Sequence, residues 1–168
     1  NSNRGISMSS ELRVDTIKLA NGNTATASGL GIGGTGKIGQ VVQVSSNGGV
    51  STTSTSFVAA PIAVTITPTA TSSKIYVSIA FMNKTATDQE FIATIYRDST
   101  NLGDSSDGFF KDQSRVANSK NLVYMQHLDS PSSTSAIEYK VYFKGEGQTV
   151  TCNNDDADWS FIAMEVLA

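Results

Sequence analysis

The chain has 168 residues, of which 39% are hydrophobic and only 16% are charged; a typical soluble domain carries roughly 25% charged residues. Ser, Thr, Asn and Gly make up the shortfall, which favours an all-β protein of one domain plus an appendage. A net charge of -3 with scattered Lys and Arg argues against nucleic acid as a partner, the single cysteine excludes an intramolecular disulfide, and no stretch is apolar enough to predict membrane insertion.

The first 39 residues are predicted to form an extended N-terminal arm. Leu12 and Val14, then Ile17 and Leu19, alternate with polar residues in two short extended pieces. A run of Ala, Thr, Ser and Gly follows from Thr24 to Gly39, and it has too few large apolar side chains to form a core. This arm is predicted to act as a linker or to become ordered only against a neighbouring molecule. No secretion signal is visible at its start.

From residue 40 to residue 168 the chain is predicted to form a β-sandwich. Short apolar or alternating segments recur without a helical period, separated by turn residues, as in a jelly roll. The predicted strands are Gln40–Val44, Ser56–Ala60, Ile62–Thr67, Lys74–Asn83, Glu90–Arg97, Leu122–Leu128, Ala136–Lys144, Gln148–Cys152 and Trp159–Leu167.

The last predicted strand is apolar on both faces. Trp159, Phe161, Ala163 and Leu167 fall on one face, whereas Ile162, Met164 and Val166 fall on the other. Because one face of a sandwich strand normally meets water, the second apolar face indicates a cover. We interpret the cover as another subunit, and we place Trp159, Phe161, Ala163 and Leu167 at the interface between subunits; a loop of the same chain is the alternative.

Two acidic loops are candidate ligand-contacting segments. The connection Asp98–Asn121 contains Asp104, Asp107, Phe109 and Phe110, and the two phenylalanines are more simply read as a cap on the sandwich. Asp155 and Asp156 lie in the second acidic turn, between the last two predicted strands. Its carboxylates resemble calcium ligands, but the spacing of a known calcium loop is missing, so we predict no metal.

No enzyme is predicted, and no cofactor. The sequence lacks a G-x-S-x-G elbow, and both His127 and Cys152 are interpreted as structural residues. The glycine-rich stretch that ends at Lys37 superficially resembles a phosphate loop, but Ile38 stands where Ser or Thr is required.

Several passages spread over nearly the whole chain point to a family. They are Ser9–Gly22, Gly36–Gln43, Ser72–Val77, Ile95–Gly103, Leu128–Val141 and Ala163–Val166. Together these passages resemble fibre and spike proteins of tailed bacteriophages, particularly those of marine phages. Familiar fibres are longer and carry repeats, which this chain does not.

The resemblance implies a homotrimeric virion protein on the tail or the capsid surface. It implies attachment to other virion proteins through the arm, with Leu12, Val14, Ile17 and Leu19 as contacts, and adhesion to a host-surface glycan or protein through the β domain. Asp104, Asp107, Phe109, Phe110, Asp155 and Asp156 are then the candidate receptor-facing residues. A capsid decoration protein without receptor binding is the first alternative, and a carbohydrate-binding module is the second.

Overall fold

A computed structural model describes residues 36–153 and 157–168 of the chain. The chain divides between Gly34 and Thr35, and all described residues belong to the second unit. Every regular element among them is a β-strand, as predicted for an all-β protein. The strands are β1 (Lys37–Ser46), β2 (Val50–Thr52), β3 (Val58–Ile66), β4 (Lys74–Thr85), β5 (Gln89–Arg97), β6 (Thr100–Asn101), β7 (Phe110–Ser114), β8 (Ser119–Asp129), β9 (Ile137–Lys144), β10 (Val150–Cys152) and β11 (Trp159–Leu167).

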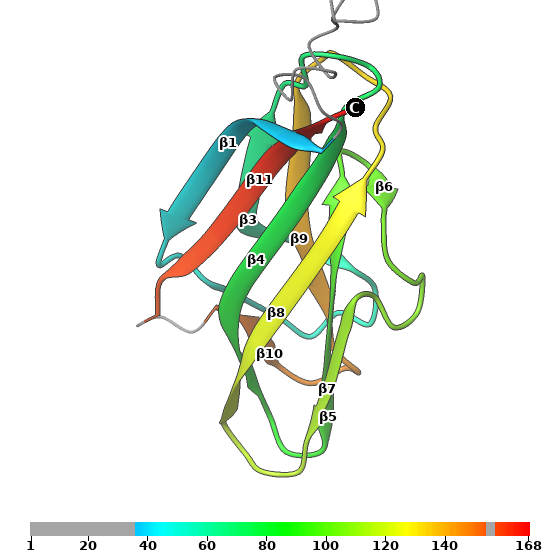
Figure 1. Cartoon of the computed structure of the whole chain (residues 1–168). Coiled ribbons are helices and arrows are strands. Elements are labelled where there is room, and N and C mark those ends of the chain that lie inside the picture. The colour runs from blue at the N-terminus through cyan, green and yellow to red at the C-terminus, as the bar shows by residue number, and fades with distance from the viewer. Residues whose placement is uncertain (1–35, 154–156) are drawn as a thin grey trace, which may run out of the picture. The chain divides into compact units, whose positions relative to one another are not determined.

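The strands form two antiparallel sheets that face each other as a sandwich (Figure 1). We call the sheet with the order β1-β11-β4-β8 the front sheet; β10 continues the line of β11 along β4 and pairs with β2. The back sheet has the order β3-β9-β5, with β6 and β7 both paired to β5. If the eight strands other than β2, β6 and β10 are numbered in chain order, the sheets read 1-8-3-6 and 2-7-4-5. This is the strand order of a jelly roll, and it confirms the predicted fold class.

The core lies between the two sheets and follows from strict alternation along the strands. In β4, Ile75, Val77, Ile79 and Phe81 point inward and are almost completely buried. The back sheet answers with Phe91, Ile95, Tyr139, Val141 and Phe143, and the rings of Phe91 and Phe143 stack with centroids 5.7 Å apart. Because each such side chain contributes about 1.5–3 kcal/mol when fully buried, the inward faces dominate the stability of the sandwich.

A buried polar cluster ties the two sheets together at one end. The guanidinium of Arg97, from the back sheet, donates to both oxygens of Asp129 at 2.9 Å, and Asp129 belongs to the front sheet. The hydroxyl of Tyr139 donates to the same carboxylate at 2.7 Å. Burial and the neighbouring Asp129 carboxylate both raise the pKa of Tyr139, so the phenol stays protonated and remains a donor.

A second buried carboxylate holds β1 and a loop against β11. Glu165 accepts hydrogen bonds from the side chain of Gln40 at 2.9 Å and from the backbone N–H and hydroxyl of Thr69 at 2.6 and 2.7 Å. Burial alone would raise the pKa of Glu165, but the hydrogen bonds from Gln40 and Thr69 outweigh it and lower this pKa to about 2. The carboxylate therefore stays charged and paired at neutral pH.

The strands differ from the sequence prediction in four places, one of which is β2, a three-residue strand that was not predicted. β1 begins at Lys37, three residues before the predicted domain boundary at Gln40. The two segments predicted on either side of Pro61 form the single strand β3, because Pro61 lies where the register shifts by a bulge in an edge strand. The predicted loop Asp98–Asn121 contains β6 and β7, whose polar residues gave no strand signal.

Candidate functional site: the outer face of the front sheet

The outer face of the front sheet carries an apolar surface that spans all four of its long strands. Figure 1 shows these strands, β1, β11, β4 and β8, side by side in the front layer. Several of its large side chains are about half exposed, namely Ile38 (52%), Val41 (56%), Leu122 (63%), Tyr124 (52%) and Leu128 (48%). Ile162, Met164, Val166, Tyr76, Ala80 and Met82 lie between them, half-buried by their neighbours. We call this set of eleven residues the apolar face.

The strand register brings these residues into rows across the sheet. In one row Val41 lies opposite Met164, Met164 opposite Tyr76, and Tyr76 opposite Leu128. Other rows pair Ile38 with Val166 and Met82 with Leu122. Side chains directly opposite on antiparallel strands lie close enough to pack together, so the rows form one continuous surface.

Several polar groups on the same face are already bonded to each other. Gln126 accepts hydrogen bonds from the hydroxyls of Tyr76 at 2.6 Å and Tyr124 at 3.2 Å. Ser78 donates to the Tyr124 oxygen at 3.2 Å, and Gln43 donates to Ser160 at 2.9 Å. Covering polar groups that already have partners costs little free energy. Burial of this part of the front sheet against another molecule would therefore cost little free energy.

Charge is confined to the ends of this face. Its outward positions on the four long strands include no Asp or Glu, and its lysines stand at the two extremes of the strands, with Lys74 at one end and Lys84 beside Lys120 at the other. Depletion of charge at the centre, with Met and Tyr present, is typical of the core of a protein–protein interface.

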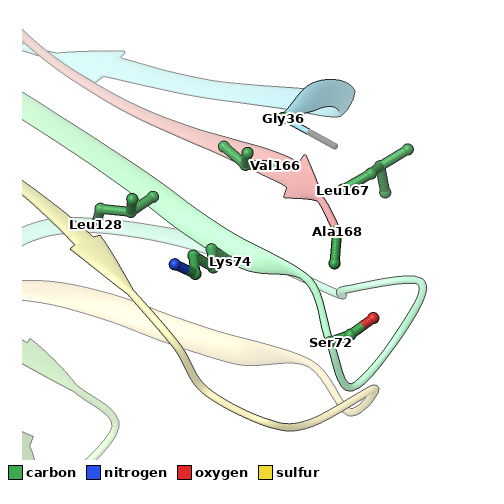
Figure 2. Close-up of a pocket in the computed structure, with 7 residues that line it drawn as sticks. All are labelled: Gly36, Ser72, Lys74, Leu128, Val166, Leu167 and Ala168. Carbon is green, nitrogen blue, oxygen red and sulfur yellow. The ribbon is translucent and has the colours of Figure 1, made fainter. Parts of the chain in front are cut away.

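A shallow pocket of about 340 Å³ continues the apolar face at the end of β11. Figure 2 shows Val166, Lys74 and Leu128 along its floor, on β11, β4 and β8, and Ser72 on the loop before β4. Gly36, Leu167 and Ala168 complete its wall. The pocket is mostly aliphatic, with the Lys74 ammonium as its charged group.

The structure corrects the predicted position of the interface on β11. Trp159, Phe161 and Ala163 are 3%, 0% and 0% exposed, because they point between the two sheets and pack in the core. Only Leu167, near the end of the strand, is half-buried. The side of β11 that remains free is the opposite one, with Ile162, Met164 and Val166. Because its ring is buried, Trp159 also cannot stack on a sugar ring, as a carbohydrate-binding module would require.

The exposed carboxylates of Asp104 and Asp107 have partners within the Asp98–Asn121 segment. Asp104 accepts hydrogen bonds from the backbone N–H groups of Ser106 and Asp107 at 2.7 and 2.8 Å, and these bonds lower the pKa of its carboxyl. Lys111 lies 3.2 Å from Asp107 and 2.7 Å from Glu90. Only Asp104 and Asp107 of the predicted receptor-facing residues in this segment are exposed.

Phe109 and Phe110 do not face outward as predicted for receptor-facing residues, because both side chains pack against the core. The ring of Phe110 lies edge-on to Phe91 at 6.4 Å. The ring of Phe109 lies 5.2 Å from that of His127. These contacts fit the simpler interpretation, in which the two phenylalanines close one end of the sandwich.

The remaining candidates are placed as follows. Cys152 is buried, and burial raises the pKa of its thiol, which is the environment of a structural cysteine. No group of three or more possible metal ligands occurs among residues 36–153 and 157–168. Within these same ranges there is no helix with the length and apolarity to cross a membrane. Asp155, Asp156, Leu12, Val14, Ile17 and Leu19 lie outside the described residues.

The fold and this face define a jelly-roll domain with an apolar sheet face that residues 36–153 and 157–168 leave uncovered. No protein-family model matches the sequence, and no curated protein matches it either. Among solved structures, a chain from the structure of the infectious bursal disease virus Gx strain is similar, with a TM-score of 0.40 and 14% identity. The match covers 92% of this chain and 42% of the viral chain, so the chain spans less than half the length of that neighbour. At this TM-score the likeness carries no argument about function.

Proposed function

We propose that the chain is a structural protein of a tailed-bacteriophage particle, a trimeric fibre or spike. Its N-terminal segment attaches it to other virion proteins, and its jelly roll stands outward for adhesion to the host surface. The observation that carries this proposal is the apolar face, which crosses four strands and carries charge only at its ends, as surfaces that bind other proteins do. The passages that resemble phage fibre and spike proteins supply the particle as the context, and the proposal requires no catalysis.

Capsid decoration is a second candidate, and one observation favours it. In the segment Asp98–Asn121 the carboxylates of Asp104 and Asp107 are bonded within the segment, and the rings of Phe109 and Phe110 pack against the core. No preformed receptor site is therefore apparent among the described residues of this segment. A decoration protein needs a subunit interface and an attachment segment, but no receptor site.

Labelling of intact particles tests the proposal. Antibodies raised against the full chain should bind purified particles of the phage that encodes it, and electron microscopy should place the label on tail or head. Added free chain should slow phage adsorption if the chain is an adhesin and leave adsorption unchanged if it only decorates the capsid. Absence of the chain from purified particles would contradict both candidates.

A further inference from the structure

We propose that one end of the front sheet, where β4 ends and β8 begins, binds a saccharide that carries an acidic group. Figure 1 shows this end of the two strands, at which β10 also pairs with β4. The inference rests on the proposed function only for the source of the saccharide, which is the host surface. The binding itself rests on the charges, hydroxyl groups and hollows at this end of the sheet.

Two lysines stand opposite each other on neighbouring strands at this end. Lys84 on β4 and Lys120 on β8 are register partners, and both lie on the outward side of the front sheet. Like charges directly opposite each other on antiparallel strands destabilise the pairing. Neither ammonium group forms an ion pair with any residue in the described parts of the chain. The pair is therefore a place of uncompensated positive charge.

Protection of a sheet edge does not explain both lysines. Lysine on an edge strand discourages pairing with another chain, and Lys120 lies on the edge strand β8. Lys84, in contrast, lies on β4, which is paired at this position with β10 on one side and with β8 on the other. Because a strand paired on both sides has no free edge, the charge of Lys84 has another role.

Hydroxyl groups continue this row on the next two strands. Thr151 on β10 is the register partner of Lys84, and Ser51 on β2 is the register partner of Thr151. The two hydroxyl oxygens lie 2.8 Å apart and form a hydrogen bond. Since a hydroxyl has one proton and two acceptor positions, the bonded pair still offers a proton and lone pairs to a ligand. We call Ser51, Thr151, Lys84 and Lys120 the lysine row.

Two adjoining shallow hollows lie beside the lysine row. One has a volume of about 130 Å³ and is lined by Lys84, Thr85, Ala86, Asn118, Thr149 and Thr151. The other has a volume of about 370 Å³ and is lined by Ser51, Thr52, Thr53 and Thr149. Neither lining includes an Asp or a Glu among the described residues, and the buried hydroxyl of Thr85 has no hydrogen-bond partner among them. The larger hollow falls within the ~300–1,000 Å³ typical of ligand sites.

This mixture of groups fits an acidic saccharide better than other anions. Hydroxyl and amide side chains both donate to and accept from sugar hydroxyls, and the two ammonium groups pair with a carboxylate, sulfate or phosphate on the sugar. Nucleic acid is a weaker candidate, because the chain has a net charge of -3 and no aromatic side chain lines either hollow to stack on a base.

The site does not exist in any one segment of the chain. The Asp98–Asn121 segment contributes only Asn118 and Lys120, and the other groups come from β2, β4, β10 and the residues beside them. It forms only when four strands distant in sequence are paired.

The test measures binding of the full-length chain to immobilised oligosaccharides. Glucuronate-, sialate-, sulfate- and phosphate-bearing oligosaccharides are placed beside neutral ones of the same backbone, and bound chain is detected with an antibody. The test variant is Lys84→Gln with Lys120→Gln. The matched control is Lys140→Gln with Lys144→Gln, which removes the same charge from the outer face of the back sheet. Circular dichroism checks that each chain is folded.

The native chain and the control should bind at least one class of acidic oligosaccharide and none of the neutral counterparts. Lys84→Gln with Lys120→Gln should weaken this binding by about tenfold or more, because two charge-assisted contacts are lost. Lys120→Glu should also weaken it by about tenfold or more, while the thermal midpoint without saccharide stays the same or rises, because an attraction replaces the repulsion of Lys84. A purely structural role of the lysines would not produce this combination.

Three results would overturn the inference: a native chain that binds no acidic oligosaccharide, equal binding of the neutral ones, or unchanged binding by the Lys84→Gln/Lys120→Gln variant. Tighter binding of polyglutamate or of single-stranded DNA in the same assay would also overturn it, in favour of a peptide or a nucleic acid. Particle labelling is read separately. A labelled particle whose chain binds no acidic saccharide overturns only this inference, and binding by a chain that is absent from particles overturns only the proposed function.

Discussion

The two sheets of this jelly roll have the same inward alternation but opposite outer faces. On the back sheet the outward groups use one another as partners. The rings of Tyr96 and Tyr142 stack with centroids 3.9 Å apart, the Lys144 ammonium lies 4.7 Å from the Phe57 ring centroid, and Lys140 pairs with Glu138 at 2.7 Å. The lysine ammonium groups cover the aromatic rings and remain hydrated, so the outer face of the back sheet can stay exposed to water.

The front sheet lacks that shielding. Its outward rows end in Val41, Leu122 and Leu128, each close to half exposed or more, without an acidic or basic group among them. The two sheets share the inward alternation and differ in their outward residues, which are mostly charged on β9 and mostly aliphatic on β11. The difference teaches that the outer face of a sheet is matched to its surroundings: the back face has the composition of a surface in water, and the front face has the composition of the interface that we propose.

The largest loss of folding stability is expected when the hydrogen-bonded cluster of Arg97, Asp129 and Tyr139 between the two sheets is disrupted. Asp129→Ala leaves the Arg97 guanidinium and the Tyr139 hydroxyl without their shared acceptor. Loss of a buried charged partner costs about 3–5 kcal/mol, and we expect about 2–4 kcal/mol here because Arg97 is partly exposed. Urea unfolding of the full chain measures this loss.

The matched control for that change is Asp107→Ala, which removes an exposed carboxylate from its 3.2 Å contact with Lys111. This variant should cost less than about 0.5 kcal/mol. Equal losses for the two aspartates would mean that the inter-sheet cluster does not stabilise the sandwich.

A loss of folding stability of intermediate size is expected at acid pH, when Glu165 on the inward side of β11 becomes protonated. The pKa of Glu165 falls from its ordinary 4.5 to about 2 on folding. Its contribution is therefore complete above pH 4.5 and is lost as the pH falls toward 2. Glu165→Gln should remove this part of the pH dependence, measured as the difference between urea midpoints at pH 6 and pH 3. An unchanged difference in the variant would contradict the account of this carboxylate.

A smaller loss of folding stability, and the sharpest contrast between the two outer faces, is expected from substitutions of two tyrosines. Tyr142→Ala on the back sheet removes one stacked ring and should cost about 0.5–1.5 kcal/mol beyond the lost area, with no change in solution mass. Tyr124→Ala on the front sheet removes a half-exposed ring from the apolar face and should weaken the trimer on dilution. If both variants changed the mass alike, the two outer faces would not differ in function.

Much of the fold was predictable from the sequence. Alternation in β4, β8, β9 and β11 located the strands, because large apolar residues recur at every second position. β7 was missed because it is a short, polar strand, FKDQS, held by pairing with β5 and not by its own side chains. Such pairing is tertiary information that a local pattern does not contain.

The candidate site was predictable only in part. The pattern of β11 correctly showed two apolar faces, yet alternation does not tell which face points inward. The larger rings of Trp159 and Phe161 fill the space between the sheets, together with a Glu165 carboxylate satisfied by Gln40 and Thr69. The exposed partners on β1 and β8, such as Val41 and Leu128, become part of the site only through the register of four strands distant in sequence.

The central claim, that protein covers the front sheet and water meets the back sheet, is tested most directly by thiol accessibility. Ala80→Cys places a thiol in the middle of the apolar face, and Ala63→Cys places one on the outer face of the back sheet; both alanines are half-buried. The native Cys152 is buried and should react slowly with an alkylating reagent. The account predicts that the thiol at position 80 is protected in concentrated full-length chain and reacts on dilution, whereas the thiol at position 63 reacts at the same rate throughout. Equal, concentration-independent reactivity at the two positions would contradict the account.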